Sequence, residues 1–397
     1  MIIHRNTINP FLKELYFDSI HKHAGITYTD ELETLSNQVI LVEGERLTPE
    51  LILRLKNQGN KLVVFDINDN SIFTYTYSHS PATLEIDLMF KVAGIQKTNF
   101  SYDTYVNSEM GFSKVLLQFL NEERWSFYET LKKTNRIHSL PYVPYSHFNV
   151  DLTPWEDKNK LALVRGGHHY SRFLIFLQLL RINFIDRNSV FNAIDYRGTF
   201  CPDCKKAIEE QGKITFDYVR NHKMRCKVSD VSGSIFDRRG DWNNSDIPKF
   251  MQMGDIFNKK NPIDLSMFED AFCSSFMAEN YFHQLISRYI LFADLKWVFS
   301  IYVPPRFWQA AQAHTVNLVG SRINDQDYFP EIKEGDHYLS YSEDFSDLES
   351  FKNVTKEQSD HIAQNCFSLY KHWIYPDRYK ISTNLINHIV EKINEIR

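Results

Sequence analysis

A strand–helix–strand pattern near the N-terminus constrains the fold of this chain more than any other feature. Residues 38–42 form a short, continuous apolar run, which is typical of a strand buried on both faces. A helix is predicted to follow, with Thr48 as its cap, Pro49 in its first position and Gly59 after its end. Residues 61–66 then read as a second strand. This order predicts a βαβ unit, and therefore a parallel sheet.

The same kind of opening recurs in the second half of the chain. Residues 161–164 predict a strand, Gly166 and Gly167 a turn, and residues 171–181 a strongly apolar helix. The chain has 397 residues, more than the ~250–300 at which one hydrophobic core usually stops growing. We therefore expect an α/β protein with two Rossmann-like lobes, whose parallel sheets face a cleft. The predicted division is residues 1–154, residues 155–375, and a C-terminal helix in 376–397 that packs back on the first lobe.

Weaker patterns fill in the remaining elements. Residues 1–36 give only weak helical hints. Later segments predict, in order, a helix at 278–292, a strand at 296–299, a helix at 306–313, a strand at 315–319 and a helix at 355–370.

Charge and composition exclude several classes of protein. A formal net charge of −5 argues against a surface that is basic throughout, although a local basic patch could still bind nucleic acid. No run approaches ~20 apolar residues, so no transmembrane helix is expected. The first residues lack the pattern of a secretory signal, and five cysteines, an odd number, indicate reduced thiols. We expect a cytoplasmic protein.

The segment after residue 164 has the composition of a phosphate-binding loop. Gly166 and Gly167 allow the backbone to approach a ligand, and a predicted helix N-terminus follows them. Arg165 and Arg172 add fork-shaped donors that suit a diphosphate, with His168 between them. The alternative is a plain tight turn with solvated arginines.

A second segment, residues 303–348, carries a family resemblance. It opens with Pro304-Pro305-Arg306 and a short helix, continues into an apolar strand and a loop with Asp327, and ends near Asp347-Leu348. This order resembles the donor site of GT-B glycosyltransferases, in particular bacterial spore-maturation-type and group 1 members. The resemblance implies a first lobe for the acceptor, a second lobe for a nucleotide-sugar donor such as a UDP-sugar, and transfer of the sugar to an acceptor hydroxyl.

The match departs from the family at named positions. Many retaining members carry two glutamates eight residues apart, where this chain has Ile301 and Gln309. The Gln309 amide can still bind ribose hydroxyls. Because the first glutamate is absent, an alternative hypothesis remains: a catalytically degenerate protein that only binds the nucleotide sugar. His314 replaces the customary glycine of the turn.

The resemblance leaves the acceptor and the base open. The acceptor is either a glycan or metabolite, or hydroxymethylated phage DNA, since phage base-glucosylating enzymes share the GT-B fold. The DNA alternative would use a basic groove of Arg220, Lys223, Arg225, Lys227, Arg238 and Arg239. Candidates for the catalytic base are Glu45, Asp66 and Asp69, which follow strands of the first lobe. The predicted donor-binding residues are Arg165, Gly166, Gly167, His168, Arg172, Arg306, Gln309 and Asp327.

No tightly bound cofactor is expected, since the nucleotide-diphosphate sugar is a co-substrate. Asp325 and Asp327 could hold a divalent metal, although solvated loop carboxylates are the commoner meaning of such a pair. Cys201, Cys204 and Cys226, with His222, could bind zinc, which would make a zinc-containing nucleic-acid-binding protein a third reading.

Overall fold

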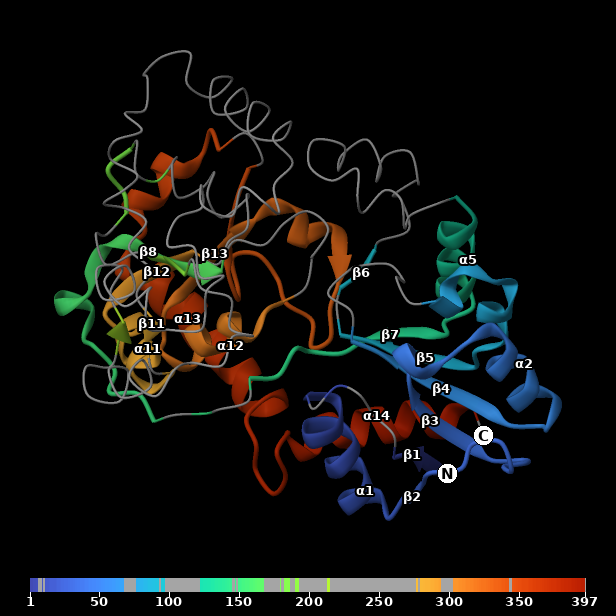
Figure 1. Cartoon of the computed structure of the whole chain (residues 1–397). Coiled ribbons are helices and arrows are strands. Elements are labelled where there is room, and N and C mark those ends of the chain that lie inside the picture. The colour runs from blue at the N-terminus through green and yellow to red at the C-terminus, as the bar shows by residue number, and fades with distance from the viewer. Residues whose placement is uncertain are drawn as a thin grey trace, which may run out of the picture.

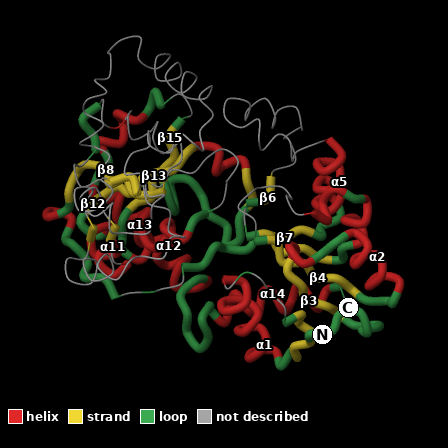
Figure 2. Tube along the Cα trace, viewed as in Figure 1, coloured by secondary structure: helices red, strands yellow, loops and turns green. Residues whose placement is uncertain are grey.

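The computed structural model describes residues 1–5, 9, 11–67, 76–92, 94–96, 122–144, 147, 149–167, 179, 182–185, 190–192, 213–214, 276–277, 279–293, 303–342 and 345–396. These residues form two α/β lobes, which lie side by side in Figure 1. Figure 2 shows a separate sheet in each lobe.

The first lobe is built on a six-stranded sheet in which every pairing is parallel. Its order is β2-β1-β3-β4-β5-β7. The strands are β1 (Ile2–His4), β2 (Thr27–Thr29), β3 (Val39–Glu43), β4 (Lys61–Asp66), β5 (Leu88–Lys91) and β7 (Ile137–Ser139). The predicted βαβ unit is confirmed as β3, α2 (Pro49–Asn57) and β4, and the Thr48 hydroxyl caps α2 by accepting from the Leu51 N–H at 3.2 Å.

Helices cover both faces of this sheet. Alternate strand residues such as Leu41 and Val63 pack on one face with α1 (Asp18–Ala24) and α14 (Thr383–Glu395). Their neighbours, such as Val42 and Val64, pack on the other face with α2 and α5 (Glu122–Lys133). Burial on both faces explains why β3 and β4 read as continuous apolar runs.

The second lobe has a five-stranded sheet, again with every pairing parallel. Its order is β15-β13-β12-β8-β9. The elements are β8 (Asn159–Gly167), β9 (Val190–Asn192), α11 (Glu279–Ile286), β12 (Tyr289–Ala293), α12 (Pro305–Gln312), β13 (Val316–Gly320), β15 (Leu339–Tyr341) and α13 (Lys356–Trp373). The predicted fold class, two α/β lobes with parallel sheets, is confirmed. β10 (Lys213–Ile214) and β11 (Phe276–Met277) form a separate two-stranded antiparallel sheet.

Two local predictions were wrong, and a third was incomplete. The helix predicted for residues 278–292 ends at Ile286, and its apolar continuation is strand β12, buried along its whole length between β8 and β13. Gly166 and Gly167 do not turn, because β8 continues through them and pairs with Phe191 and Asn192 of β9. The helical hints in residues 1–36 are confirmed by the helical segment Leu12–Phe17 and by α1, but they missed β1, which lies between β2 and β3.

The two lobes are joined by more than the connecting chain. β6 (Ile95–Gln96) of the first lobe pairs antiparallel with β14 (Gln326–Asp327) of the second. Gly94 sits where the two come together, since a Cβ there would lie 2.7 Å from both the Gln326 Cβ and the Tyr328 ring. Only glycine fits this approach without displacement. One hydrophobic core also runs through both lobes, from Phe90 to Trp308.

The last helix of the chain belongs to the first lobe in space. α14, red in Figure 1, lies beside α1 and beneath the first sheet. Ile386 and Ile389 are fully buried in the same core as Leu15 and Ile20. The Lys380 ammonium also bonds the Glu14 carboxylate at 3.0 Å.

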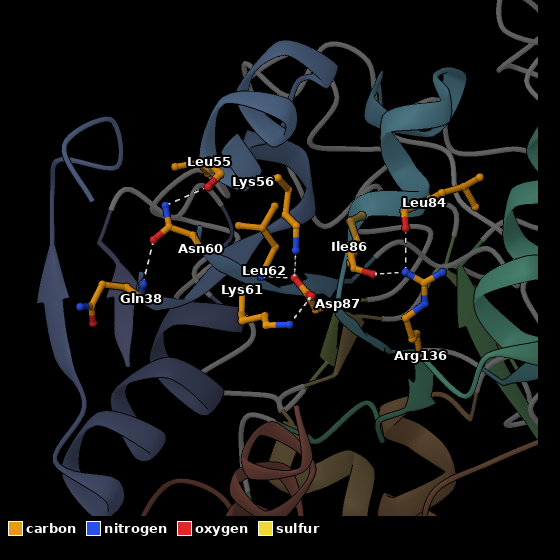
Figure 3. A network of polar contacts seen from close by, with 10 residues as sticks. All are labelled: Gln38, Leu55, Lys56, Asn60, Lys61, Leu62, Leu84, Ile86, Asp87 and Arg136. Atoms are coloured by element: carbon orange, nitrogen blue, oxygen red, sulfur yellow. Dashed lines mark hydrogen bonds and ion pairs between the residues drawn. The ribbon is translucent and has the colours of Figure 1, made fainter. Parts of the chain in front are cut away.

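Hydrogen bonds and an ion pair connect the loops at the amino edge of the first sheet to its strands (Figure 3). The Asp87 carboxylate accepts from the Leu62 N–H at 2.8 Å and from the Lys56 ammonium at 2.6 Å. The Arg136 guanidinium donates to the carbonyls of Leu84 and Ile86 at 2.7 and 2.9 Å. These groups hold the loops at that edge, so the opposite edge is the one left for a ligand site.

Candidate functional site

The carboxyl edges of the two sheets face one another. Val92 follows β5 and Leu140 follows β7 in the first lobe, and both line a small cavity with Val303, Trp308 and Tyr328 of the second lobe. The cavity measures about 10 Å³, so the base of this junction is closely packed. Since ligands of parallel sheets bind beyond the carboxyl ends of the strands, the junction is the place to look for a site.

The first sheet ends in polar residues at this edge. Each of five neighbouring strands has a buried polar side chain as its last residue: His4, Glu43, Asp66, Lys91 and Ser139. We call this set the strand-end row. Only Asp66 among them was predicted as a site residue. The signal that could have found the others is an apolar strand that ends in one polar residue, repeated from strand to strand.

Asp66 and Lys91 form an ion pair at the centre of the row. They are register partners on β4 and β5, their charged atoms are 3.5 Å apart, and both side chains are 0 % exposed. Buried charges are tolerated in proteins when they are paired. The structure therefore places Asp66 in a buried pair and away from solvent, and its role as a catalytic base stays a prediction.

Two further members of the row lie on neighbouring strands. The Glu43 carboxylate accepts from the Asn9 N–H at 3.2 Å and is almost wholly buried. Burial lowers the pKa of His4, Arg46 lowers it further, and Asp30 opposes both effects. A lowered pKa leaves the His4 imidazole neutral at pH 7, and a neutral imidazole can accept a proton.

Of the other two predicted bases, the structure describes Glu45 but not Asp69. Glu45 lies in the 3₁₀ turn Gly44–Arg46 directly after β3, and its side chain is exposed. Glu45 thus lies beyond the carboxyl end of β3, two residues after Glu43 of the strand-end row. Asp69 is outside the described residues.

The second sheet brings the predicted donor-binding residues to its own carboxyl edge. Arg165, Gly166 and Gly167 are the last three residues of β8. His168 and Arg172 lie outside the described residues. Because β8 and β12 are parallel, the chain leaves both strands at the same edge.

Arg306 lies at that edge as well. It stands in the first turn of α12, the helix that returns the chain from the carboxyl end of β12 to the start of β13. The Asn317 amide of β13 donates to the Phe307 carbonyl at 3.1 Å and so fixes the first turn of α12 on the sheet. Gln309, one turn further along, is 5 % exposed. A helix N-terminus with a cation favours an anion.

Asp327 occupies a different place from the other predicted donor residues. It lies on β14, exposed, opposite Ile95 of the first lobe. Asp325 ends the 3₁₀ turn just before it. Within the described part of the chain, no group of three or more His, Cys, Asp or Glu side chains is arranged to hold a metal ion.

Other predicted residues fall outside the described ranges. They are the zinc candidates Cys201, Cys204, His222 and Cys226, and the basic residues Arg220, Lys223, Arg225, Lys227, Arg238 and Arg239. Among the helices described, none is both long and apolar enough to cross a membrane.

Comparison with known proteins gives weak structural likenesses and no sequence match. Neither a protein-family model nor a curated protein matches the sequence. An α1,3-fucosyltransferase is similar at 11% identity over 99% of this chain and 89% of that chain, with a TM-score of 0.41. Anabaena Alr3699/HepE, solved with UDP and glucose, is similar at 9% identity over 99% and 98%, with a TM-score of 0.38.

A GtfA/B complex structure gives a third likeness, at 8% identity over 92% of this chain, with a TM-score of 0.40. The chain spans 58% of that protein. At these TM-scores the likenesses assign no function. The two parallel sheets with facing carboxyl edges nevertheless define the class of fold: this is a GT-B-like α/β protein, as the resemblance of residues 303–348 implied.

Proposed function

We propose that the protein transfers a sugar from a nucleotide-diphosphate sugar to the hydroxyl of a glycan or small metabolite. The observation that carries the proposal is the meeting of two carboxyl edges at one junction. One edge presents Arg306 on a helix N-terminus, and the other presents the strand-end row beside Glu45. A cationic edge opposite an edge with proton acceptors suits a donor and an acceptor held face to face.

The second edge would hold the donor diphosphate. In sugar transfer, the bond between the sugar carbon and the diphosphate oxygen breaks, and its electron pair leaves with the diphosphate. Negative charge therefore grows on the leaving group. Arg306 and the N–H groups of the first turn of α12 would meet that charge, and the extended backbone at Gly166 and Gly167 would allow close approach.

The first edge would hold the acceptor. The acceptor hydroxyl oxygen forms the new bond to the sugar carbon, and its proton passes to a base. Among the predicted bases within the described residues, Glu45 is the exposed one, whereas Asp66 is engaged with Lys91. We assign the proton transfer to Glu45 and a positioning role to the strand-end row.

Nucleotide binding tests the donor half of the proposal. Isothermal titration with UDP, GDP and ADP should show binding of one of them, weakened by about tenfold to a hundredfold in Arg306→Ala, as loss of a charged hydrogen bond costs ~1.5–3 kcal/mol. Arg378→Ala, which removes an exposed arginine of the connection before α14, is the matched control. No binding of any of the three nucleotides, or equal binding by both variants, would sink the proposal.

Turnover separates a working enzyme from a degenerate binding protein. A live donor site releases free sugar slowly from the bound nucleotide sugar even without acceptor. Glu45→Gln should slow transfer while it leaves nucleotide affinity unchanged, and Glu391→Gln on the surface of α14 should change neither. Nucleotide binding without sugar release would favour the degenerate protein.

A further inference from the structure

A second hollow lies on the far side of the second lobe from Arg306. Its volume is about 470 Å³, within the range of small-molecule sites. It is walled by the segment before β8, by the turn before β13 and by α13. Both the start of β8 and the start of β13 are at the amino edge of the sheet, opposite the edge of the candidate donor site. The residues that matter for its chemistry are Trp155, Lys158, His314, Asp360, Gln364 and Asn365.

Charges of both signs line this hollow. Lys158 contributes one ammonium, which donates to the His314 carbonyl at 2.6 Å, and Asp360 contributes one carboxylate. His361 also lines the hollow, with its Nε2 3.3 Å from the Asp336 carboxylate. Burial lowers the pKa of His314, and Lys158 lowers it further, so that imidazole is neutral at pH 7. A phosphate or nucleotide would meet Asp360 as well as Lys158, and a cation would meet Lys158 as well as Asp360. The wall therefore favours a neutral ligand.

The remaining groups suit a ligand with many hydroxyls. The amides of Gln364 and Asn365 each offer donors and acceptors, which match hydroxyl groups that also do both. Trp155 adds an indole to the wall, and the Lys160 ammonium covers one face of that ring at 3.8 Å from its centre, which leaves the rest of the ring for a ligand. An indole offers an apolar surface to the C–H groups of a sugar ring, as aromatic side chains do when a ligand has both apolar and polar parts.

We propose that this hollow is a binding site for a neutral sugar, separate from the candidate donor site. The inference comes from the opposite charges and the polar side chains that line the hollow, and it does not depend on the proposed transferase activity. If both hold, the site would retain an acceptor glycan at a second point on the enzyme, which raises its effective concentration near the junction.

Sugar titrations test the site directly. Saturation-transfer NMR with glucose, galactose, N-acetylglucosamine and maltose should detect at least one binder, with a Kd of about 1 mM or weaker, as expected of a small polar ligand. Asp360→Ala and Gln364→Ala remove exposed side chains of α13 and should each weaken binding, by about tenfold together. Gln358→Ala, exposed on the same helix but outside the hollow, is the control.

The outcomes are distinct from those of the nucleotide titration. Sugar binding that persists at saturating UDP, and that falls in the α13 variants, supports the site. Displacement of the sugar by UDP would place it in the donor site and overturn the inference. So would tighter binding of inorganic phosphate, unchanged binding in the Asp360→Ala/Gln364→Ala double variant, or no saturable binding of any of the four sugars.

Discussion

The buried pair of Asp66 and Lys91 offers the sharpest test of how the first sheet is built. Both side chains are fully buried, and their charged atoms are 3.5 Å apart. In Asp66→Ala the fully buried Lys91 ammonium loses the carboxylate that lies 3.5 Å from it, so its charge is less well compensated in the interior. Removal of one partner from such a pair costs about 3–5 kcal/mol.

That loss is measurable by urea denaturation followed by circular dichroism. With a slope of about 3 kcal/mol per M, the midpoint of Asp66→Ala should fall by roughly 1 M or more. Lys91→Met added to Asp66→Ala also removes the buried positive charge and should recover much of the loss. Glu33→Ala is the control, because Glu33 pairs with Arg54 at 2.8 Å with both side chains exposed, and such pairs contribute about 0–1 kcal/mol.

The reasoning is refuted if Asp66→Ala unfolds at the same urea concentration as the unaltered protein, or if the double variant is no more stable than Asp66→Ala. A further variant, Asp66→Asn, addresses catalysis. A base that acts on the acceptor would give Asp66→Asn a large loss of kcat with little change in stability. We expect the opposite for Asp66→Asn: a clear loss of stability, with no loss of kcat beyond what that loss of stability explains.

Three other predictions concern the lobe junction and the titrating groups. Gly94→Ala should lower the stability by about 1–3 kcal/mol in thermal unfolding, because its Cβ would lie 2.7 Å from the Gln326 Cβ of the facing strand. Gly320→Ala, whose Cβ would have its nearest contact at 3.3 Å, should lose less stability, and equal losses would contradict this. Burial lowers the pKa of His388 to about 4, so NMR should find the ring neutral at pH 6, and its contribution to stability should be present above pH 6.5 and decline as the pH falls toward 4. Burial lowers the pKa of Lys158 to about 8, so the rate at which an amine-reactive probe labels Lys158 should rise between pH 7 and 8 and level off above pH 9. A labelling rate that still rises tenfold per pH unit at pH 9 would show this assignment to be wrong.

Local patterns were enough to predict the elements that are long or clearly capped. Thr48 and Pro49 mark the start of α2, and Thr355 caps α13 through the Gln358 N–H at 3.2 Å. The helix predicted at 306–313 and the strand predicted at 315–319 match α12 and β13 to within one residue. Each of these signals lies within a few residues of the element that it starts, so the sequence alone carries it.

Features that depend on distant partners were missed. β1 has three residues, too few for any periodicity, and is a strand because β2 and β3 flank it. The run at residues 289–293 is equally apolar in a helix or a strand, and only its place between β8 and β13 decides. Gly166 and Gly167 read as a turn because the pairing with β9 is not visible locally.

The candidate site shows the same division. The rule that polar residues after strands are site candidates found Asp66, but its pairing with Lys91 depends on the register of β4 against β5. The strand-end row as a whole needs five strands in one parallel sheet, of which only β3 and β4 were clearly predicted. Arg306 was predicted from the residues next to it in the sequence. That the two sheet edges face each other depends on the pairing of β6 with β14, which joins residues more than 200 apart and could not be predicted.

The position of α14 bears on how this chain folds during synthesis. The side chains that complete the core beneath the first sheet, among them Ile386 and Ile389, are translated roughly 250 residues after the last strand of that sheet, which at ~5–20 residues per second is some 12–50 s. For that interval the part of this face that α14 covers stays exposed, and only α1 and the helical segment before it cover the rest. We therefore expect the N-terminal half, expressed without α14, to aggregate or to recruit chaperones, and a separately supplied peptide of residues 376–397 to rescue it.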